Sequence, residues 1–164
     1  MPRPAARLAG GAFVALLLAA ALAPPAHAQK VRISNLADVN FGTIANLQAD
    51  SRQSQSICVY SQGAGGAYSV TASGSGSGSA FTLANGAFAL PYEVQWSPAS
   101  GQANGTTLSA NVALSGQTST ATQQTCNSGP ANSASLIVVL RSAALSQARM
   151  GSYNGTLTLV IAAE

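Results

Sequence analysis

Residues 153–161 alternate between apolar and polar side chains with the period of a β-strand. One face of this stretch carries Leu157, Leu159 and Ile161, and the other carries two threonines and a valine. Successive side chains of a strand point to opposite faces, so a strict alternation indicates one buried and one exposed face. A half-buried strand needs a sheet to join. The rest of the chain should therefore supply further strands.

Further short runs of β-forming residues recur along the chain, separated by turn-forming glycine, asparagine and serine. Seven or eight short strands with turns roughly every 8–12 residues are typical of an all-β sandwich. Asn85-Gly86 between two apolar runs predicts a hairpin, whereas polar residues 46–56 predict a loop. The fold class predicted is all-β, an antiparallel sandwich of immunoglobulin-like size. The runs assigned to strands are residues 31–41, 57–60, 68–72, 81–83, 88–96, 108–114, 118–125 and 136–140.

Residues 1–28 have the features of a cleaved secretory signal peptide. Arg3 and Arg7 precede an apolar run, residues 13–22, that is too short to span a bilayer. Two prolines then precede Ala26-His27-Ala28, a small-x-small cleavage signal. We expect cleavage before Gln29 and a single exported domain over residues 29–164, without a transmembrane segment. An uncleaved membrane anchor is the alternative, which the short apolar run disfavours.

The expected mature chain has few groups for acid–base, metal or nucleic-acid chemistry. Its only histidine, His27, falls in the signal peptide, and five basic residues remain against four acidic ones. Catalysis near neutral pH usually uses histidine or paired carboxylates, and metal sites use clustered His, Cys or acidic groups. Nucleic-acid binding needs a basic patch. We therefore expect no enzyme, no catalytic residue, no cofactor, no metal site and no nucleic-acid partner.

Two cysteines, Cys58 and Cys126, lie in the exported region. An even number of cysteines in an exported protein predicts a disulfide bond. Neither cysteine belongs to a CxxC motif, and no base for a reactive thiol accompanies them. The expected role of the bond is structural.

Two other patterns have both a structural and a functional interpretation. Leu90, Tyr92, Val94 and Trp96 alternate with polar residues, which favours a buried strand face over an exposed aromatic platform for glycans. The Gly/Ser-rich residues 73–79 predict a flexible hairpin loop rather than a domain linker. They are not a phosphate-binding loop because no GK[ST] follows.

Taken together, several short motifs resemble the spore coat protein U-like domains, which include subunits of archaic chaperone–usher pili. The signal peptide is followed by Asn40-Phe41-Gly42, by the strand of Cys58, and by Tyr68-Ser69-Val70. The chain then closes with Gly151-Ser152-Tyr153-Asn154-Gly155-Thr156-Leu157-Thr158-Leu159. The resemblance covers nearly all of residues 29–164.

The resemblance implies an immunoglobulin-like sandwich that lacks its last strand. A periplasmic chaperone would supply that strand first, and the N-terminal segment of a neighbouring pilus subunit would replace it after passage through an outer-membrane usher. Strand addition of this kind satisfies an open sheet edge with backbone hydrogen bonds. The implied destination is a surface pilus or coat involved in adhesion or biofilm formation, reached through the periplasm. The implied strand-addition groove is lined by Tyr153, Leu157, Leu159 and Ile161.

The role of the N-terminal residues within such a fibre stays open. Val31 and Ile33 could fill the groove of a neighbour as a short donor strand. If residues 31–41 instead form the first strand of their own domain, the subunit would accept a strand without donating one. The alternative function is a self-complete secreted β-sandwich that binds a ligand or coats the cell surface.

Overall fold

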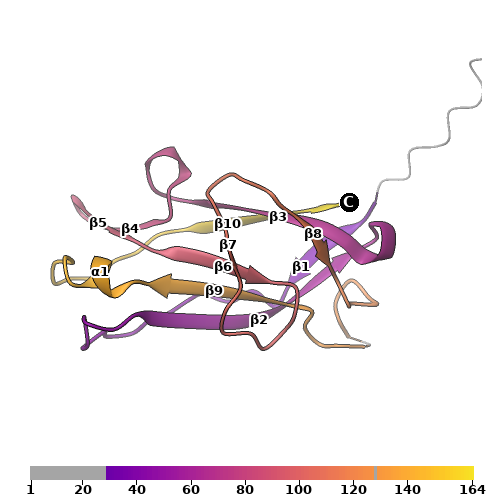
Figure 1. Ribbon diagram of the computed structural model, residues 1–164, viewed down its shortest axis with the longest axis horizontal. Helices are drawn as coiled ribbons and strands as arrows, with labels where there is room; N and C mark the ends of the chain where they lie inside the picture. Colours follow the sequence, from indigo (N-terminus) through magenta and orange to yellow (C-terminus); the bar gives the residue numbers. More distant parts are fainter. Residues whose placement is uncertain (1–28, 128) are drawn as a thin grey trace, which may run out of the picture.

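The computed structural model describes residues 29–127 and 129–164 (Figure 1). Two antiparallel sheets enclose one apolar core, and a separate hairpin joins them. In spatial order the larger sheet contains β1 (Val31–Ser34), β2 (Ser51–Ser61), β9 (Ala134–Leu140), β6 (Glu93–Ser97) and β7 (Thr106–Thr107). The smaller sheet contains β10 (Leu157–Ala163), β3 (Ala67–Gly74) and β8 (Leu114–Thr118). The hairpin is β4 (Thr82–Asn85) and β5 (Phe88–Pro91). The short helical segments are η1 (Ala64–Gly66), η2 (Ser77–Ser79) and α1 (Ser142–Leu145). The predicted all-β sandwich is confirmed.

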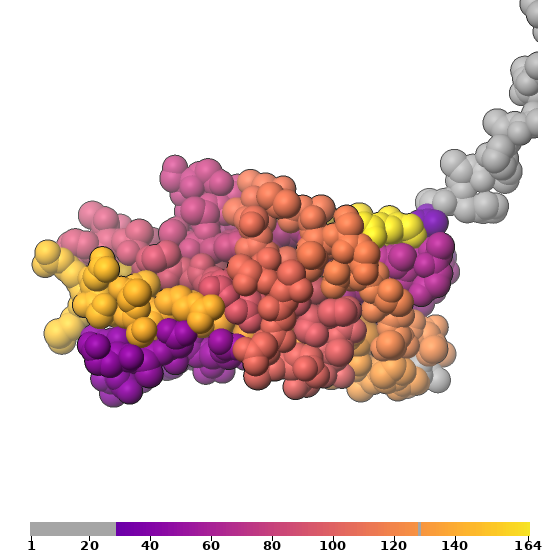
Figure 2. All heavy atoms as spheres, viewed as in Figure 1, coloured from indigo at the N-terminus to yellow at the C-terminus, as the bar shows by residue number. Residues whose placement is uncertain are grey.

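Strand β9 is the centre of the larger sheet. All seven of its residues are buried, as the apolar pattern on both faces predicted. Leu136 and Leu140 face the core between the sheets. On the outer face, Ser135 Oγ donates to the carbonyl oxygen of Ala99 at 2.8 Å. The β6–β7 connection therefore covers this face, and Figures 1 and 2 show it crossing in front of β9.

The core has an aromatic pair and a disulfide. Trp96 and Tyr68 are both 0% exposed, and the indole N–H donates to the Tyr68 hydroxyl at 3.1 Å. Their rings meet edge to face, with centroids 6.2 Å apart. The predicted disulfide between Cys58 and Cys126 is confirmed. It ties the connection between β8 and β9 to β2.

The loop predicted over residues 46–56 is wrong for its second half. Residues from Ser51 onward belong to β2 and pair with β9. Their polar side chains are satisfied by the β6–β7 connection, since Ser54 Oγ donates to Gln102 and Ser56 Oγ accepts from Gly101 N–H. Polar residues can thus form a strand when a neighbouring strand pairs with their backbone and a loop bonds their outward side chains.

The aromatic stripe at residues 88–96 is also corrected in part. It is divided between β5 and β6, which belong to different sheets. Trp96 is 0% and Tyr92 is 9% exposed. Both rings are therefore core residues, as the alternation favoured, and neither is free to serve as a glycan platform. The Asn85-Gly86 hairpin is confirmed, with Asn85 opposite Phe88.

Two further predicted strands do not form as expected. Residues 108–113 turn at Asn111, whose φ of 61° interrupts an extended backbone, so β8 begins only at Leu114. Beyond Thr118 the chain leaves the sheet, and Ser119 Oγ donates to the Val59 carbonyl oxygen. The Gly/Ser-rich stretch contains η2 and connects β3 to β4. It is a loop, but not a hairpin, because β4 pairs with β5.

The predicted signal peptide, residues 1–28, lies outside the residues that the structure describes. The part of the chain that the structure covers has no helix of sufficient length and apolarity to cross a membrane.

Candidate functional site: an open strand edge

Strand β10 is paired along one edge only. The backbone N–H of Glu164 donates to the Ala67 carbonyl oxygen at 3.2 Å, and that of Thr156 donates to Ser75 Oγ at 3.0 Å. An antiparallel ladder bonds alternate residues, so the even-numbered residues of β10 direct their backbone groups at β3. The odd-numbered residues direct theirs at the other edge, where no strand among the described residues pairs. We call this the open edge of β10, residues 157–163.

The side chains at the open edge are incompletely covered. Leu157, Leu159 and Ile161 pack against the core but are only half buried. The inward side chains of the neighbouring strand, Tyr68 and Val70 among them, are 0% exposed. The core is therefore closed over β3 and open over β10. An added strand would find both unpaired backbone groups and uncovered apolar surface there.

The other sheet edges carry features that discourage pairing. Natural edge strands are kept short, charged, bulged or covered, because an open edge invites another strand. β1 has four residues, including Arg32, and β7 has two residues. β8 contains Gly116 at a φ of 71° and meets β3 across a register shift. Only β10, among the described edges, has seven residues without charge, proline, glycine or register shift.

Strand β1 lies beside the opening, and the segment after it runs along β2. β1 is close to β10, but no backbone hydrogen bond joins these two strands in the described residues. Figure 1 shows residues 35–50 running back alongside β2 to the end of the molecule where β2 begins. Within this segment Phe41 and Ile44 are half buried and pack against the core.

The structure brings together three of the four residues predicted for the strand-addition groove. Leu157, Leu159 and Ile161 follow one another on the inward face of β10. Tyr153 precedes the strand, and its hydroxyl accepts a hydrogen bond from the Arg149 N–H at 3.1 Å. The predicted strand began too early because Asn154 pairs with Ala84 of β4 instead.

Val31 and Ile33, the residues of the possible donor strand, lie in β1. They pair with Ser61 and Val59 of β2 in the same chain. In this structure the segment is therefore the first strand of its own domain. The strand predicted over residues 31–41 is wrong beyond Ser34, because Asn35 takes a φ of 64° and the chain leaves the sheet. Phe41 and Ile44 were not predicted as site residues. The only sequence signal at that place is Asn40-Phe41-Gly42.

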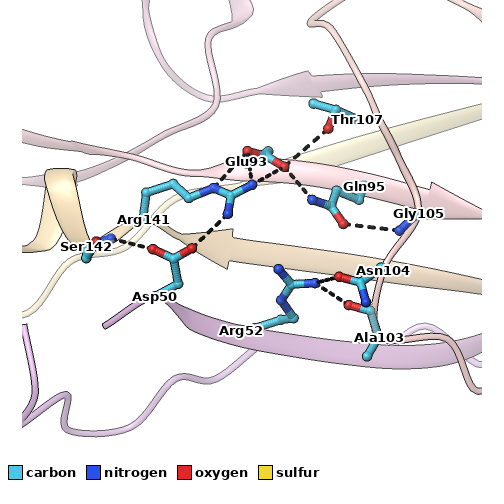
Figure 3. Close-up of polar contacts among 10 residues, drawn as sticks. All are labelled: Asp50, Arg52, Glu93, Gln95, Ala103, Asn104, Gly105, Thr107, Arg141 and Ser142. Atoms are coloured by element: carbon cyan, nitrogen blue, oxygen red, sulfur yellow. Dashed lines mark hydrogen bonds and ion pairs between the residues drawn. The ribbon is translucent and has the colours of Figure 1, made fainter. Parts of the chain in front are cut away.

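A polar cluster crosses the larger sheet near α1, at the outer ends of β2, β6 and β9 (Figure 3). Arg141 donates to both carboxylate oxygens of Glu93, at 2.7–3.0 Å, and to Asp50 at 2.7 Å. The N–H of Ser142 donates to Asp50 at 2.8 Å, which together with Arg141 lowers the pKa of Asp50. Partial burial acts to raise the pKa of Glu93, but hydrogen bonds from Gln95 and Arg141 outweigh it, so the pKa is lowered. The guanidinium is engaged by two carboxylates, so the cluster joins strands and is a structural site.

Residues 29–127 and 129–164 contain no group of three or more His, Cys, Asp or Glu side chains placed to hold a metal ion. Of the charges outside the polar cluster, Arg52 donates to Ala103 and Asn104, Arg149 lies over the Phe88 ring, and Glu164 accepts from the Gly116 N–H. The open edge of β10 has the unpaired backbone groups and the uncovered apolar side chains that a binding site for a strand requires.

No family model matches the sequence, and no curated protein matches it. The fold is similar to that of a chain in a solved structure described as a chaperone–tip adhesin complex, vital for synergistic activation of CFA/I fimbriae biogenesis. The two chains superpose with a TM-score of 0.53 at 15% sequence identity, over 83% of this chain and 41% of that chain. This chain thus spans less than half of the length of that one. At this identity the likeness shows the fold alone, a fold shared with a chain of that complex.

Proposed function

We propose that this protein is a strand-accepting structural subunit of a surface fibre or coat, assembled by the chaperone–usher route. The observation that carries the proposal is the open edge of β10. It combines unpaired backbone groups at Leu157, Leu159 and Ile161 with half-buried side chains at the same residues. An extended segment added there would satisfy the backbone and cover the core in one step.

The partner implied by this geometry is a peptide segment with alternating apolar side chains. Its inward side chains would pack over Leu157, Leu159 and Ile161, while its backbone bonds to the open edge. In the proposed pathway a periplasmic chaperone provides such a segment first, and a neighbouring subunit provides it in the finished fibre. The fimbria-related fold and the resemblance in sequence support this choice of partners. The role we propose is structural or adhesive and not catalytic.

The position of the subunit in a fibre depends on β1. As long as Val31 and Ile33 stay paired with β2, residues 31–34 are not free to serve as a donor. With cleavage before Gln29, as the sequence predicts, this subunit would accept a strand and keep its own first strand. We therefore place it at the end of a fibre, or in a coat.

Binding of a synthetic strand tests the proposal. The probe is a nine-residue peptide of alternating threonine and valine with a lysine at each end, and the control peptide has serine in place of each valine. Native mass spectrometry of residues 29–164 should show a one-to-one complex with the valine peptide and none with the serine peptide. Failure of the valine peptide to bind a folded, oxidised domain would contradict the proposal and favour a self-complete sandwich.

A further inference from the structure

The β1–β2 ladder stops before the segment that could continue it. Its last two pairs are Ile33 with Val59 and Ser34 with Cys58. Asn35 then adopts a φ of 64°, which turns the backbone out of the extended conformation. If the same register continued, Ala37 would lie opposite Gln55. We call residues 35–44, which run along β2 without pairing with it, the strap.

The side chain of Gln55, and not the backbone of β2, bonds the strap at Ala37. The N–H of Ala37 donates to Gln55 Oε1 at 2.9 Å, and Gln55 Nε2 donates to the Ala37 carbonyl oxygen at 3.1 Å. A carboxamide has one acceptor and one donor group, so it can bond both polar groups of a residue as a strand would. The Gln55 amide therefore holds Ala37 in register while keeping it at a distance from β2.

A hollow of about 220 Å³ separates the strap from β2. It is lined on the strap side by residues 37–40 and on the β2 side by residues 53–55. The continued register would pair Asp38 with Ser54 and Val39 with Gln53. The hollow thus lies between the residues that an extended ladder would join, and its polar lining suits several water molecules.

The existing β1–β2 ladder determines which residues of β2 would form backbone hydrogen bonds if the ladder were extended. The N–H of Gln62 donates to the Lys30 carbonyl oxygen at 2.9 Å, so even-numbered residues of β2 bond toward β1. In an extended ladder, Ser54 would exchange backbone hydrogen bonds with Asp38, and Arg52 with Asn40. Neither pair is bonded in the described structure.

Few contacts hold the strap in its present place. Apart from the Ala37–Gln55 pair, Asn35 Nδ2 donates to the Ala131 carbonyl oxygen and to Asn132 Oδ1, both at 3.2 Å. The remaining anchors are Phe41 and Ile44, which are both half buried. A segment with few anchors and an unused set of backbone bonds can change its position at low cost in free energy.

We propose that the strap closes onto β2 when a strand is added at the open edge of β10. This inference rests on the proposed function. An added strand covers the core beside the strap and gives Phe41 and Ile44 a further apolar surface. That surface favours the closed position, because a ligand shifts an equilibrium only through contacts that differ between the two states. In the closed position Asp38 and Asn40 exchange backbone hydrogen bonds with Ser54 and Arg52, Ala37 releases the Gln55 amide, and the hollow empties of water.

Hydrogen exchange of residues 29–164, with and without the threonine–valine peptide, tests this closure. Native mass spectrometry first establishes that the complex has formed. In the complex, the amides of Asp38, Asn40 and Ser54 should exchange roughly tenfold more slowly than in the free protein. Amides of β9, already buried and paired, serve as the internal reference. A complex whose strap amides exchange as in the free protein overturns the closure alone. Absence of a complex overturns the proposed function, and the closure with it.

A pair of variants separates the strap from a general effect on stability. Gln55→Ala removes both hydrogen bonds to Ala37, whereas Gln53→Ala truncates an exposed side chain that lines the same hollow. In the free protein, Gln55→Ala should speed exchange at the Ala37 amide several-fold, and Gln53→Ala should not. In the complex, Gln55→Ala should retain the slow exchange of Asp38 and Asn40, because closure no longer involves the glutamine side chain. Equal exchange in the two free variants, or loss of the slow exchange in Gln55→Ala, would overturn the inference.

Discussion

Ile161 lies directly opposite Val70 in the β10–β3 ladder, yet Val70 is completely buried and Ile161 is only half buried. The two side chains belong to neighbouring strands on the same face of one sheet. Their different burial shows that the core is covered over β3 and ends over β10. The same strand has unpaired backbone groups on its outer side. Cover for the side chains and partners for the backbone are thus missing at the same place, and a single added strand would supply both.

A charge on the inward face of β10 should prevent strand addition. In Leu159→Lys the ammonium group would lie where the added strand packs, and it would lose hydration there without a partner. Val160→Lys is the matched control, because Val160 is 57% exposed on the outer face of the same strand. We expect Leu159→Lys to weaken binding of the threonine–valine peptide by more than about tenfold, the equivalent of 1.4 kcal/mol. Val160→Lys should bind like the unmodified protein, and equal binding by both variants would be inconsistent with addition at this edge.

Loss of the Tyr68 hydroxyl should destabilise the core. The Trp96 indole N–H donates to this hydroxyl in a fully buried site, and Tyr68→Phe would leave the donor without its partner. An unsatisfied buried donor costs about 1–3 kcal/mol. Urea unfolding followed by the fluorescence of Trp96 measures the loss. Tyr60→Phe, at a half-buried position in β2, is the control and should change the unfolding free energy much less.

Removal of the disulfide should lower stability by about 2–5 kcal/mol, the range typical of native disulfides in small secreted domains. Cys58 and Cys126 are 68 residues apart, so the bond restricts a long loop in the unfolded chain. The double variant Cys58→Ser and Cys126→Ser should also loosen the connection between β8 and β9. Urea unfolding of the oxidised protein and of the double variant compares the two. An unchanged midpoint would show that Ser119 and Ser133 hold this connection to β2 without the disulfide.

The polar cluster should make the protein less stable in acid. The folded protein lowers the pKa of Asp50 and of Glu93 from their ordinary values of 3.8 and 4.5. A lowered pKa in the folded state stabilises the protein above the unfolded pKa, and this contribution is lost as the pH falls through the folded value. Stability should therefore decrease as the pH falls below 4.5. Glu93→Gln should reduce the change of the unfolding free energy with pH. Asp38→Asn, at an exposed position outside the cluster, is the control and should reduce that change less. A pH dependence untouched by Glu93→Gln would contradict a role for this carboxylate.

Strands with an apolar face could be predicted from the sequence. β9 has apolar side chains on both faces, and β3 and β10 alternate regularly, so local pattern and tertiary position agree. The disulfide was predicted from the even number of cysteines and from the expectation of export. The three inward residues of the open edge were identified because they lie on one of these regular strands.

Elements stabilised by distant contacts could not be predicted in the same way. Residues 51–56 are polar and so resemble a loop in the sequence. They form a strand because the β6–β7 connection, about 45 residues later in the chain, provides hydrogen-bond partners for their side chains. Phe41 and Ile44 were missed because the strand predicted over residues 31–41 ends at Ser34, and the Gln55 side chain holds the chain beyond it. Tyr153 was placed on the strand because nothing local shows that Asn154 pairs with Ala84. In each case the deciding partner is far away in the sequence.

The central claim is that the sandwich is completed by a strand from another molecule. The most direct test is export of the full chain with and without a periplasmic chaperone from the same source, followed by size-exclusion chromatography with mass determination. The account predicts a stable one-to-one complex with the chaperone, and a much lower yield of folded monomer without it. A soluble, disulfide-bonded monomer that melts cooperatively alone and binds no chaperone would contradict the account.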